Sequence, residues 1–369
     1  MKSLTINFCG DFVSFSSCDM RVGDEIKSLL NKGNLNFVNV EAPLCDLGMR
    51  PIPKSGPSLC QPPEAASTVK AWGFNVVSLA NNHIFDYGED IARSTASAFE
   101  GINILGLGTP EDVYRVKIVE CEGVRIGFIA ACQREFGALD GDNERSYGYA
   151  WINDDRIDRA IIEARTHCDV LFVCPHAGVE EVEVPLPEWR KRYRSLIDLG
   201  ADAVIASHPH IVQGYEDYRG KRIYYSLGNF FFDRPGMKDC WHHGLMVTAT
   251  VAEGEITYEN HFVRLDGSAL SIDNEKQAEM SRFNALLSGT EYDLQIDKLI
   301  DQMLPFYDDY FAVTNSSPIG QRGLRRMLSW VRRAMKGYRD DIRLINLIRC
   351  ESHRWLYVRC LNKRSKNIY

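Results

Sequence analysis

The sequence predicts an α/β fold, in which strands alternate with helices that cover the sheet. Five short apolar segments each end in a polar cluster, and segments with apolar residues three or four positions apart lie between them. The chain has 369 residues, 45% of them hydrophobic and 25% charged, so it can bury a large core. Polar residues at the carboxyl ends of such strands are expected to converge on one edge of the sheet.

Each predicted strand is short and is followed by polar side chains. The strands cover residues 4–9, 35–38, 75–80, 169–174 and 203–206. The residues after them offer carboxylate, amide or imidazole groups: Asp11, Glu41, Asn82, His83, His176, His208 and His210. The recurrence of this pattern at five strand ends favours a binding site over turn residues that are polar by chance.

The predicted helices lie between these strands, at residues 24–31, 63–72, 88–99, 154–168 and 187–199. Two stretches break the alternation. Residues 113–132 predict a hairpin that turns at Glu122-Gly123, and residues 222–265 contain alternating apolar positions. We therefore expect antiparallel strands mixed into the sheet.

The chain is predicted to have three parts: a catalytic domain at 1–270, a helical extension at 271–319 and a basic helical tail at 320–369. From residue 320 onward the 14 lysines and arginines exceed the acidic residues by 11, whereas the whole chain has a net charge of −7. The remainder of the chain is therefore strongly acidic, which argues against nucleic acid as a partner.

Within the tail, residues 322–339 predict a basic amphipathic helix, with Leu324, Leu328 and Val331 on its apolar face. A second apolar and basic segment covers residues 342–360. Docking on the acidic body or on a partner, and peripheral contact with an anionic membrane, both fit this pattern.

Cysteine usage and the N-terminus predict a cytoplasmic protein. The basic tail adds a second possibility, peripheral contact with a membrane. The 11 cysteines form no C-x-x-C pair, which favours free thiols in a reducing compartment. The N-terminus predicts a strand rather than a signal peptide, and no segment reaches the roughly 18 apolar residues of a membrane span.

The polar strand ends form a ligand set of oxygen and imidazole groups without thiolate. Such a set suits Mn, Fe or Zn in a catalytic site. Two carboxylates with several imidazoles exceed the usual needs of one ion, so we predict two divalent ions that share a carboxylate. His208-Pro209-His210 fits this idea, because residues two apart on an extended segment point to the same side.

At these residues the sequence resembles the calcineurin-like metallophosphoesterases, specifically their bacterial capsule-synthesis branch, the CapA or poly-γ-glutamate-biosynthesis group. The segments that carry the resemblance run in the family's order between residues 4 and about 265: Phe8-Cys9-Gly10-Asp11, residues 37–41, residues 78–88, residues 175–180, residues 208–213 and residues 225–230. The N-N-H-x-x-D-x-G and S-L-G-N-F elements are the specific ones.

The resemblance implies a four-layer α/β/β/α sandwich with two metal ions at its rim. By motif position, Asp11 and His210 would serve one ion, Asn82, His176 and His208 the other, and Glu41 would bridge them. His83 matches the catalytic histidine, and Asp86 would orient its ring. The first motif departs from the superfamily's D-x-H, because Phe12-Val13 follows Asp11.

Further polar residues are expected around this rim. Asn229 and Asp233 are predicted to brace the ligands by hydrogen bonds. Arg134, together with Arg50 and Lys54, is a candidate for binding substrate anions or for bracing, although each also fits a solvated surface cation.

The predicted function is metal-dependent phosphoester hydrolysis with water as the nucleophile, in capsule or other surface-polymer biosynthesis. The expected partner is a phosphorylated small molecule or surface-polymer intermediate. Two alternatives stay open: a non-catalytic polymer-assembly or polymer-binding protein on the same fold, and a metal-dependent amidase that acts on a γ-linked peptide.

Overall fold

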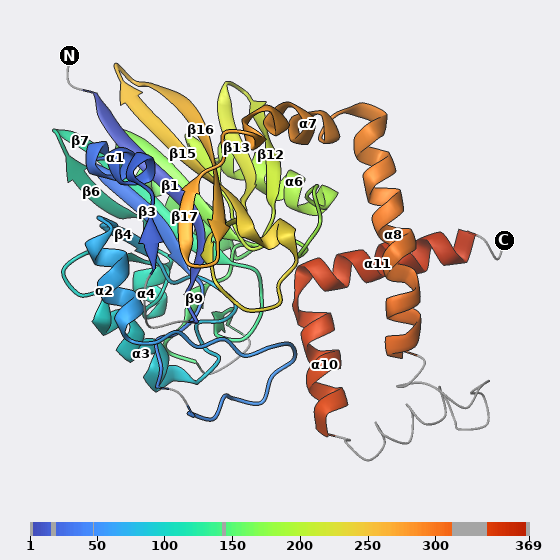
Figure 1. The fold of residues 1–369 in the computed structure, drawn as a ribbon. Helices are drawn as coiled ribbons and strands as arrows, with labels where there is room; N and C mark the ends of the chain where they lie inside the picture. Colours follow the sequence, from blue (N-terminus) through green and yellow to red (C-terminus); the bar gives the residue numbers. More distant parts are fainter. Residues whose placement is uncertain (1–2, 16–19, 47, 142–144, 312–337, 367–369) are drawn as a thin grey trace, which may run out of the picture.

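The computed structural model describes residues 3–15, 20–46, 48–141, 145–311 and 338–366, and it contains two β-sheets packed face to face between layers of helices (Figure 1). The four layers that the resemblance implied are present. The predicted strands do not form one sheet but are divided between two. Those at 4–9, 35–38 and 75–80 belong to the first sheet, whereas those at 169–174 and 203–206 pair with each other and with the hairpin in the second.

The first sheet has β1 at its centre. Among the described residues its strand order is β2-β17-β16-β15-β1-β3-β4-β5, and β14 also pairs with β1. β1 runs parallel to β3 and β14 and antiparallel to β15. The bounds are β1 Leu4–Val13, β2 Arg21–Val22, β3 Leu35–Val40, β4 Val76–Ser78, β5 Asn103–Leu105, β14 Asn229–Phe232, β15 His243–Ala252, β16 Glu255–Asp266 and β17 Ala269–Ile272.

The second sheet has the order β12-β13-β11-β10-β7-β6. Its bounds are β6 Lys117–Cys121, β7 Val124–Cys132, β10 Val170–His176, β11 Ala203–Ile205, β12 Val212–Tyr218 and β13 Lys221–Leu227. The predicted hairpin is β6–β7, and Glu122 and Gly123 at its turn have φ of 52° and 81°. Positive φ at both positions is what a two-residue hairpin turn of type I′ requires. A short pair, β8 Ala138–Leu139 and β9 Tyr149–Ala150, lies beside β7.

Helices cover the outer faces of both sheets. On the first sheet these are α1 Asp24–Lys32, α2 Glu64–Ala71 and α3 Glu89–Ala98; on the second they are α5 Asp155–Ala164 and α6 Pro187–Asp198. All five agree with the predicted helices to within a few residues. Shorter helical turns are α4 Pro110–Val113, η1 Asp239–His242 and η2 Lys276–Ala278.

Aromatic side chains fill the space between the sheets. The ring of Phe8 in β1 lies 4.9 Å from that of Phe172 in β10, which stacks on Phe128 in β7 at 5.8 Å. All three residues are fully buried. Burying such rings drives the two sheets together, and the carboxyl ends of their parallel strands then meet.

The C-terminal helices pack on the side of the second sheet (Figure 1). They are α7 Glu279–Leu286, α8 Gly289–Phe311, α10 Tyr338–Arg349 and α11 Glu351–Lys366. Leu356 and Cys360 of α11 share a buried cluster with Ile300 of α8 and Trp189 of α6. Most of the predicted basic helix, residues 322–337, lies outside the described residues, and the three-part division of the chain stays a prediction.

One expectation about the cysteines is wrong, because Cys45 and Cys60 form a disulfide with a Cα–Cα distance of 5.8 Å. The two residues are 15 positions apart and are brought together by the loop between β3 and α2. The cytoplasmic expectation loses part of its support, since disulfides persist mainly in oxidising compartments. None of the helices within the described ranges is long and apolar enough to cross a membrane.

Candidate metal centre

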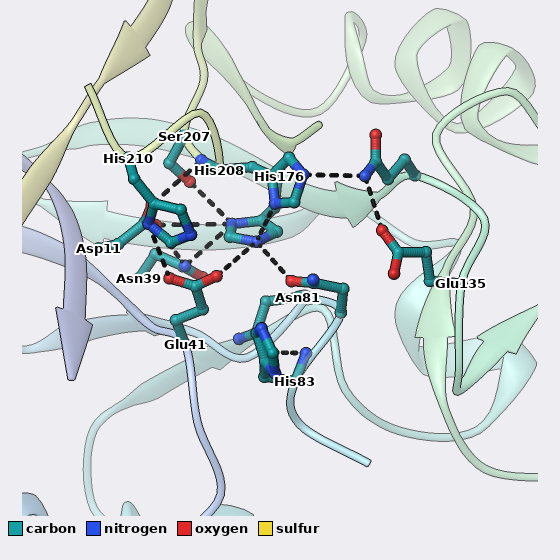
Figure 2. Close-up of polar contacts among 12 residues, drawn as sticks. Asp11, Asn39, Glu41, Asn81, His83, Glu135, His176, Ser207, His208 and His210 are labelled. Atoms are coloured by element: carbon teal, nitrogen blue, oxygen red, sulfur yellow. Dashed lines mark hydrogen bonds and ion pairs between the residues drawn. The ribbon is translucent and has the colours of Figure 1, made fainter. Parts of the chain in front are cut away.

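Residues from both sheets meet in one buried site (Figure 2). Asp11 lies in β1 and Glu41 directly follows β3, whereas His176 ends β10 and His208 and His210 follow β11. The five side chains point toward one another, and none of these residues is more than 2% exposed. Segments far apart in the sequence thus place carboxylates and imidazoles together, as predicted.

These residues form two groups whose candidate ligand atoms lie within 4.8 Å of one another. Asp11 and His210 belong to one group, His176 and His208 belong to the other, and Glu41 is common to both. Oε1 of Glu41 lies 3.3 Å from Nε2 of His176, and Oε2 lies 3.6 Å from Nδ1 of His210. Each oxygen of one carboxylate therefore faces a different group.

Asn82 joins the second group. Its Oδ1 lies 3.0 Å from Nε2 of His176, and Nδ1 of His208 lies 3.1 Å from the same nitrogen. Oxygen and imidazole atoms therefore converge on one point, which is the arrangement that a borderline divalent cation requires.

The carboxylate of Glu41 shows that these residues fit a cation. Both of its oxygens are buried and accept no hydrogen bond from any residue that the structure describes. Leaving a buried polar group unsatisfied costs about 1–3 kcal/mol, and more for a charged group. A cation between the two groups would remove that cost.

Two glycines let β1 approach the second sheet at Asp11. A Cβ on Gly10 would lie 1.9 Å from the carbonyl oxygen of Gly228, and Gly228 itself has φ of 66°. The amide of Asp11 donates to that same carbonyl at 3.1 Å. The glycines of the G-D and S-L-G-N-F motifs are therefore required by the close contact that places Asp11.

The His208-Pro209-His210 segment is not extended, which corrects the expectation. His208 has φ of 101° and His210 has φ of 61°, a region that residues other than glycine rarely adopt. Strain of this kind persists where surrounding contacts hold it, and the amide of His208 donates to Oδ2 of Asp11 at 3.1 Å. The two imidazoles still face the site, because a left-handed turn directs them there.

Burial and mutual contact redistribute charge within the site. Burial and the neighbouring Asp11 raise the pKa of Glu41 to about 8. Burial opposes a charged ring at His176, yet Asp11 and Glu41 raise the pKa of His176 to about 10. Burial also lowers the pKa of His210 to about 4. Without metal, Glu41 and His176 therefore hold protons that a cation would displace.

His83 lies beside these groups in the turn after β4 and is held by Asp86. Its Nδ1 is 2.7 Å from Oδ2 of Asp86, and that oxygen also accepts from the amide of Leu59 at 2.7 Å. Nζ of Lys54 pairs with Asp86 and lies 3.2 Å from Nδ1 of His83. Nδ1 is thus engaged, and Nε2 is the nitrogen that can exchange a proton with a ligand.

The other predicted residues have different surroundings. Asn229 contacts Nδ1 of His210 at 3.0 Å, and Asp233 accepts from the amide of Phe15 at 2.5 Å, next to the end of β1. Arg134 pairs with Asp140 at 2.6 Å and lies over Trp151. Asn229 is therefore placed to brace a ligand, whereas substrate binding by Arg134 stays a prediction.

Sequence reasoning missed several residues that hold the ligands. Asn39 donates to Asp11 at 2.7 Å and contacts Nδ1 of His176 at 3.1 Å. Gln133 contacts Nε2 of His208 at 2.9 Å, and Trp241 stacks on His210 at 3.9 Å. Asn39 and Gln133 each lie at a strand end, so the pattern that indicated the ligands could have indicated them too. Nothing in the sequence indicated Trp241.

More than half of the chain matches a known protein family. Residues 5–234 match the family described as "Bacterial capsule synthesis protein PGA_cap". The chain belongs to this family. The resemblance to the capsule-synthesis group is thereby confirmed, and the matched range contains every candidate metal ligand. The helices α7, α8, α10 and α11 lie outside it.

Two curated members of the capsule-synthesis group are similar to the chain. The capsule biosynthesis protein CapA of Bacillus anthracis is 31% identical over 178 residues, which cover 46% of this chain and 43% of that protein. The PGA biosynthesis protein CapA of Bacillus subtilis is 32% identical over 178 residues, with 46% of each chain covered. The chain thus spans about half the length of the curated relatives it matches.

Solved structures resemble the chain only distantly and add no weight to this assignment. The 5'-nucleotidase of Candida albicans aligns with a TM-score of 0.40 and 9% identity, over 79% of this chain and 58% of that one. The NAD nucleotidase of Haemophilus influenzae aligns with a TM-score of 0.40 and 11% identity, over 77% of this chain and 60% of that one.

Proposed function

We propose that this chain is a metal-dependent phosphoester hydrolase that acts in capsule or other surface-polymer biosynthesis. One observation carries the proposal: Glu41 directs one carboxylate oxygen toward each of two groups of candidate ligands. Asp11 and His210 would hold one divalent ion, and Asn82, His176 and His208 the other. Two such ions would make water more acidic and neutralise negative charge on a phosphoryl group.

The protein's own residues supply the remaining requirements of hydrolysis. Asp86 holds Nδ1 of His83, so Nε2 of His83 would donate a proton to the leaving oxygen. Burial and the nearby Lys54 lower the pKa of His83, so its protonated form releases a proton more readily than an ordinary histidine does. Asn39 and Asn229 keep Asp11 and His210 in place while substrate binds.

The His83–Asp86 pair favours an enzyme over a non-catalytic polymer-binding protein. His83 belongs to neither candidate ligand group, so a buried imidazole whose ring is fixed by a carboxylate is better explained by proton transfer than by metal binding. The family and the CapA relatives support a role in surface-polymer synthesis. The substrate would then be a phosphorylated small molecule or polymer intermediate.

A substrate panel tests the proposal. The purified chain is loaded with Mn²⁺, Fe²⁺ or Zn²⁺ and assayed on a phosphomonoester, a phosphodiester and a γ-linked peptide amide. We expect phosphoester turnover that His83→Ala lowers by on the order of 10²–10⁴-fold. Turnover of the amide alone would favour the amidase, and metal binding without turnover of any substrate would favour the non-catalytic alternative.

A further inference from the structure

A cavity of about 530 Å³ lies between the loop that follows β3 and helix α10. Residues 51–56 and Ser58 line it on the loop side, and Ile342 and Arg343 line it on the helix side. Its volume falls in the range that holds small-molecule ligands. Both walls offer apolar surface, from Ile52 and Ile342, and the cavity also carries two cations and serine hydroxyls.

Lys54 connects this cavity to the candidate catalytic residues. It lines the cavity, and its Nζ pairs with Asp86 and lies 3.2 Å from Nδ1 of His83. The candidate ligands and His83 are at most 5% exposed, so the metal centre has little room for the remainder of a substrate. The cavity reaches the His83–Asp86 pair through Lys54, and it is the space in which we place that remainder.

Arg343 gives the cavity its charge. It is exposed, and it forms no ion pair with another described residue, whereas the charge of Lys54 is largely neutralised by Asp86. A guanidinium with no carboxylate partner among the described residues, at the wall of a cavity, favours a ligand with a phosphate or carboxylate group, which it can bind through two parallel hydrogen bonds. The hydroxyl groups of Ser55 and Ser58 offer further donors.

Helix α11 anchors α10 beside this loop. Glu351 and Ser352, at the start of α11, are only 1% and 3% exposed. Glu351 accepts from the amide of Arg134 at 2.8 Å and from Asn153 at 3.0 Å. Ser352 bonds to Trp189 at 2.9 Å. Because α10 ends two residues before Glu351, these buried contacts determine where Arg343 lies.

We propose that this cavity binds a second anionic group of the substrate, with Arg343 as the recognising residue. The inference rests on the proposed hydrolase function and narrows its substrate class to phosphoesters with a further phosphate or carboxylate. It also assigns a specificity role to a helix outside the residues that match the family.

Binding of simple anions tests the cavity without catalysis. Inorganic triphosphate and tricarballylate are titrated by calorimetry into the full-length chain after chelator treatment, so that metal ions do not bind the probes. We expect Arg343→Gln to weaken binding of at least one probe about tenfold, the loss of roughly 1.4 kcal/mol. Arg349→Gln, a matched charge change on the same helix outside the cavity, should leave binding unchanged.

Kinetics then test the link to the substrate. Two phosphoserine peptides are compared, one with aspartates and one with asparagines beside the phosphoserine. Arg343→Gln should raise KM about tenfold for the aspartate peptide, with kcat unchanged, and should not alter KM for the asparagine peptide.

The outcomes separate this inference from the proposed function. If the wild type turns over no phosphoester but Arg343→Gln still weakens anion binding, the hydrolase proposal fails and the anion site stands. Equal effects of Arg343→Gln and Arg349→Gln, or no effect of either, would overturn the anion site. Preference for triphosphate or for tricarballylate identifies the anionic group.

Discussion

Oε1 of Glu41 lies 3.3 Å from Nε2 of His176, although the carboxylate follows a strand of one sheet and the imidazole ends a strand of the other. The contact therefore exists only when the two sheets are packed together. Because Glu41 also faces His210, this one side chain joins both candidate ligand groups.

Glu41→Gln should reduce the bound metal from about two ions per chain to at most one. The amide has nearly the shape of the carboxylate but lacks the charge that two cations would share. Mass-spectrometric metal analysis after dialysis against Mn²⁺ gives the count. Glu64→Gln, on the solvent side of α2, is the control, and retention of two ions by Glu41→Gln would contradict the shared-carboxylate arrangement.

His83→Ala should keep its metal and lower kcat on a phosphoester by on the order of 10²–10⁴, the usual effect of losing a general acid. His208→Ala should instead lose metal, because His208 belongs to a candidate ligand group. Metal content and kcat are measured on the same preparations. Metal loss of equal size in both variants would make His83 a ligand.

Metal affinity should rise with pH. The pKa of Glu41 is raised to about 8 and that of His176 to about 10, so both groups bind protons at pH 6 that a cation must displace. We expect the Mn²⁺ affinity to increase at least about tenfold per pH unit between pH 6 and 8, and less steeply once Glu41 is ionised. Calorimetry in two buffers of different ionisation enthalpy counts the protons released; an affinity independent of pH would argue against this protonation.

Removing the disulfide should destabilise the chain. Cys45 and Cys60 are 15 residues apart, and cross-linking a loop of about that length contributes roughly 3 kcal/mol in the chain-entropy model. The Cys45→Ser/Cys60→Ser variant is compared with the wild type by urea unfolding, each with and without reductant. Reductant should weaken only the wild type, and equal stability of all four samples would show that the bond contributes nothing.

Ser352→Ala should lower the free energy of unfolding by about 1–3 kcal/mol, because it leaves the buried indole of Trp189 without its acceptor and removes one of two donors to Oε1 of Gln133. Ser365→Ala on the exposed part of the same helix is the matched control, with an expected change within about 0.5 kcal/mol. If both variants unfold alike, α11 is not held to the body by this contact.

The sequence determined the parts of this protein that depend on local pattern. The predicted helices lie where the apolar spacing indicated, and each predicted strand leads into its polar cluster, although β1 continues past Asp11 to Val13. The sequence indicated Asp11, Glu41, Asn82, His176, His208 and His210 because each lies at or shortly after the end of an apolar segment. Parallel strands of a sheet all end at the same edge, so residues at their carboxyl ends come together there.

Only the tertiary structure decided the features that depend on residues far apart. It divided the strands between two sheets, paired Cys45 with Cys60, and turned His208 and His210 into left-handed conformations. It also joined Ser352 to Gln133, across 219 residues. Hydrophobic periodicity specifies which face of an element is buried but not its partner, and hydrogen bonds between distant segments form only after packing has brought those segments together.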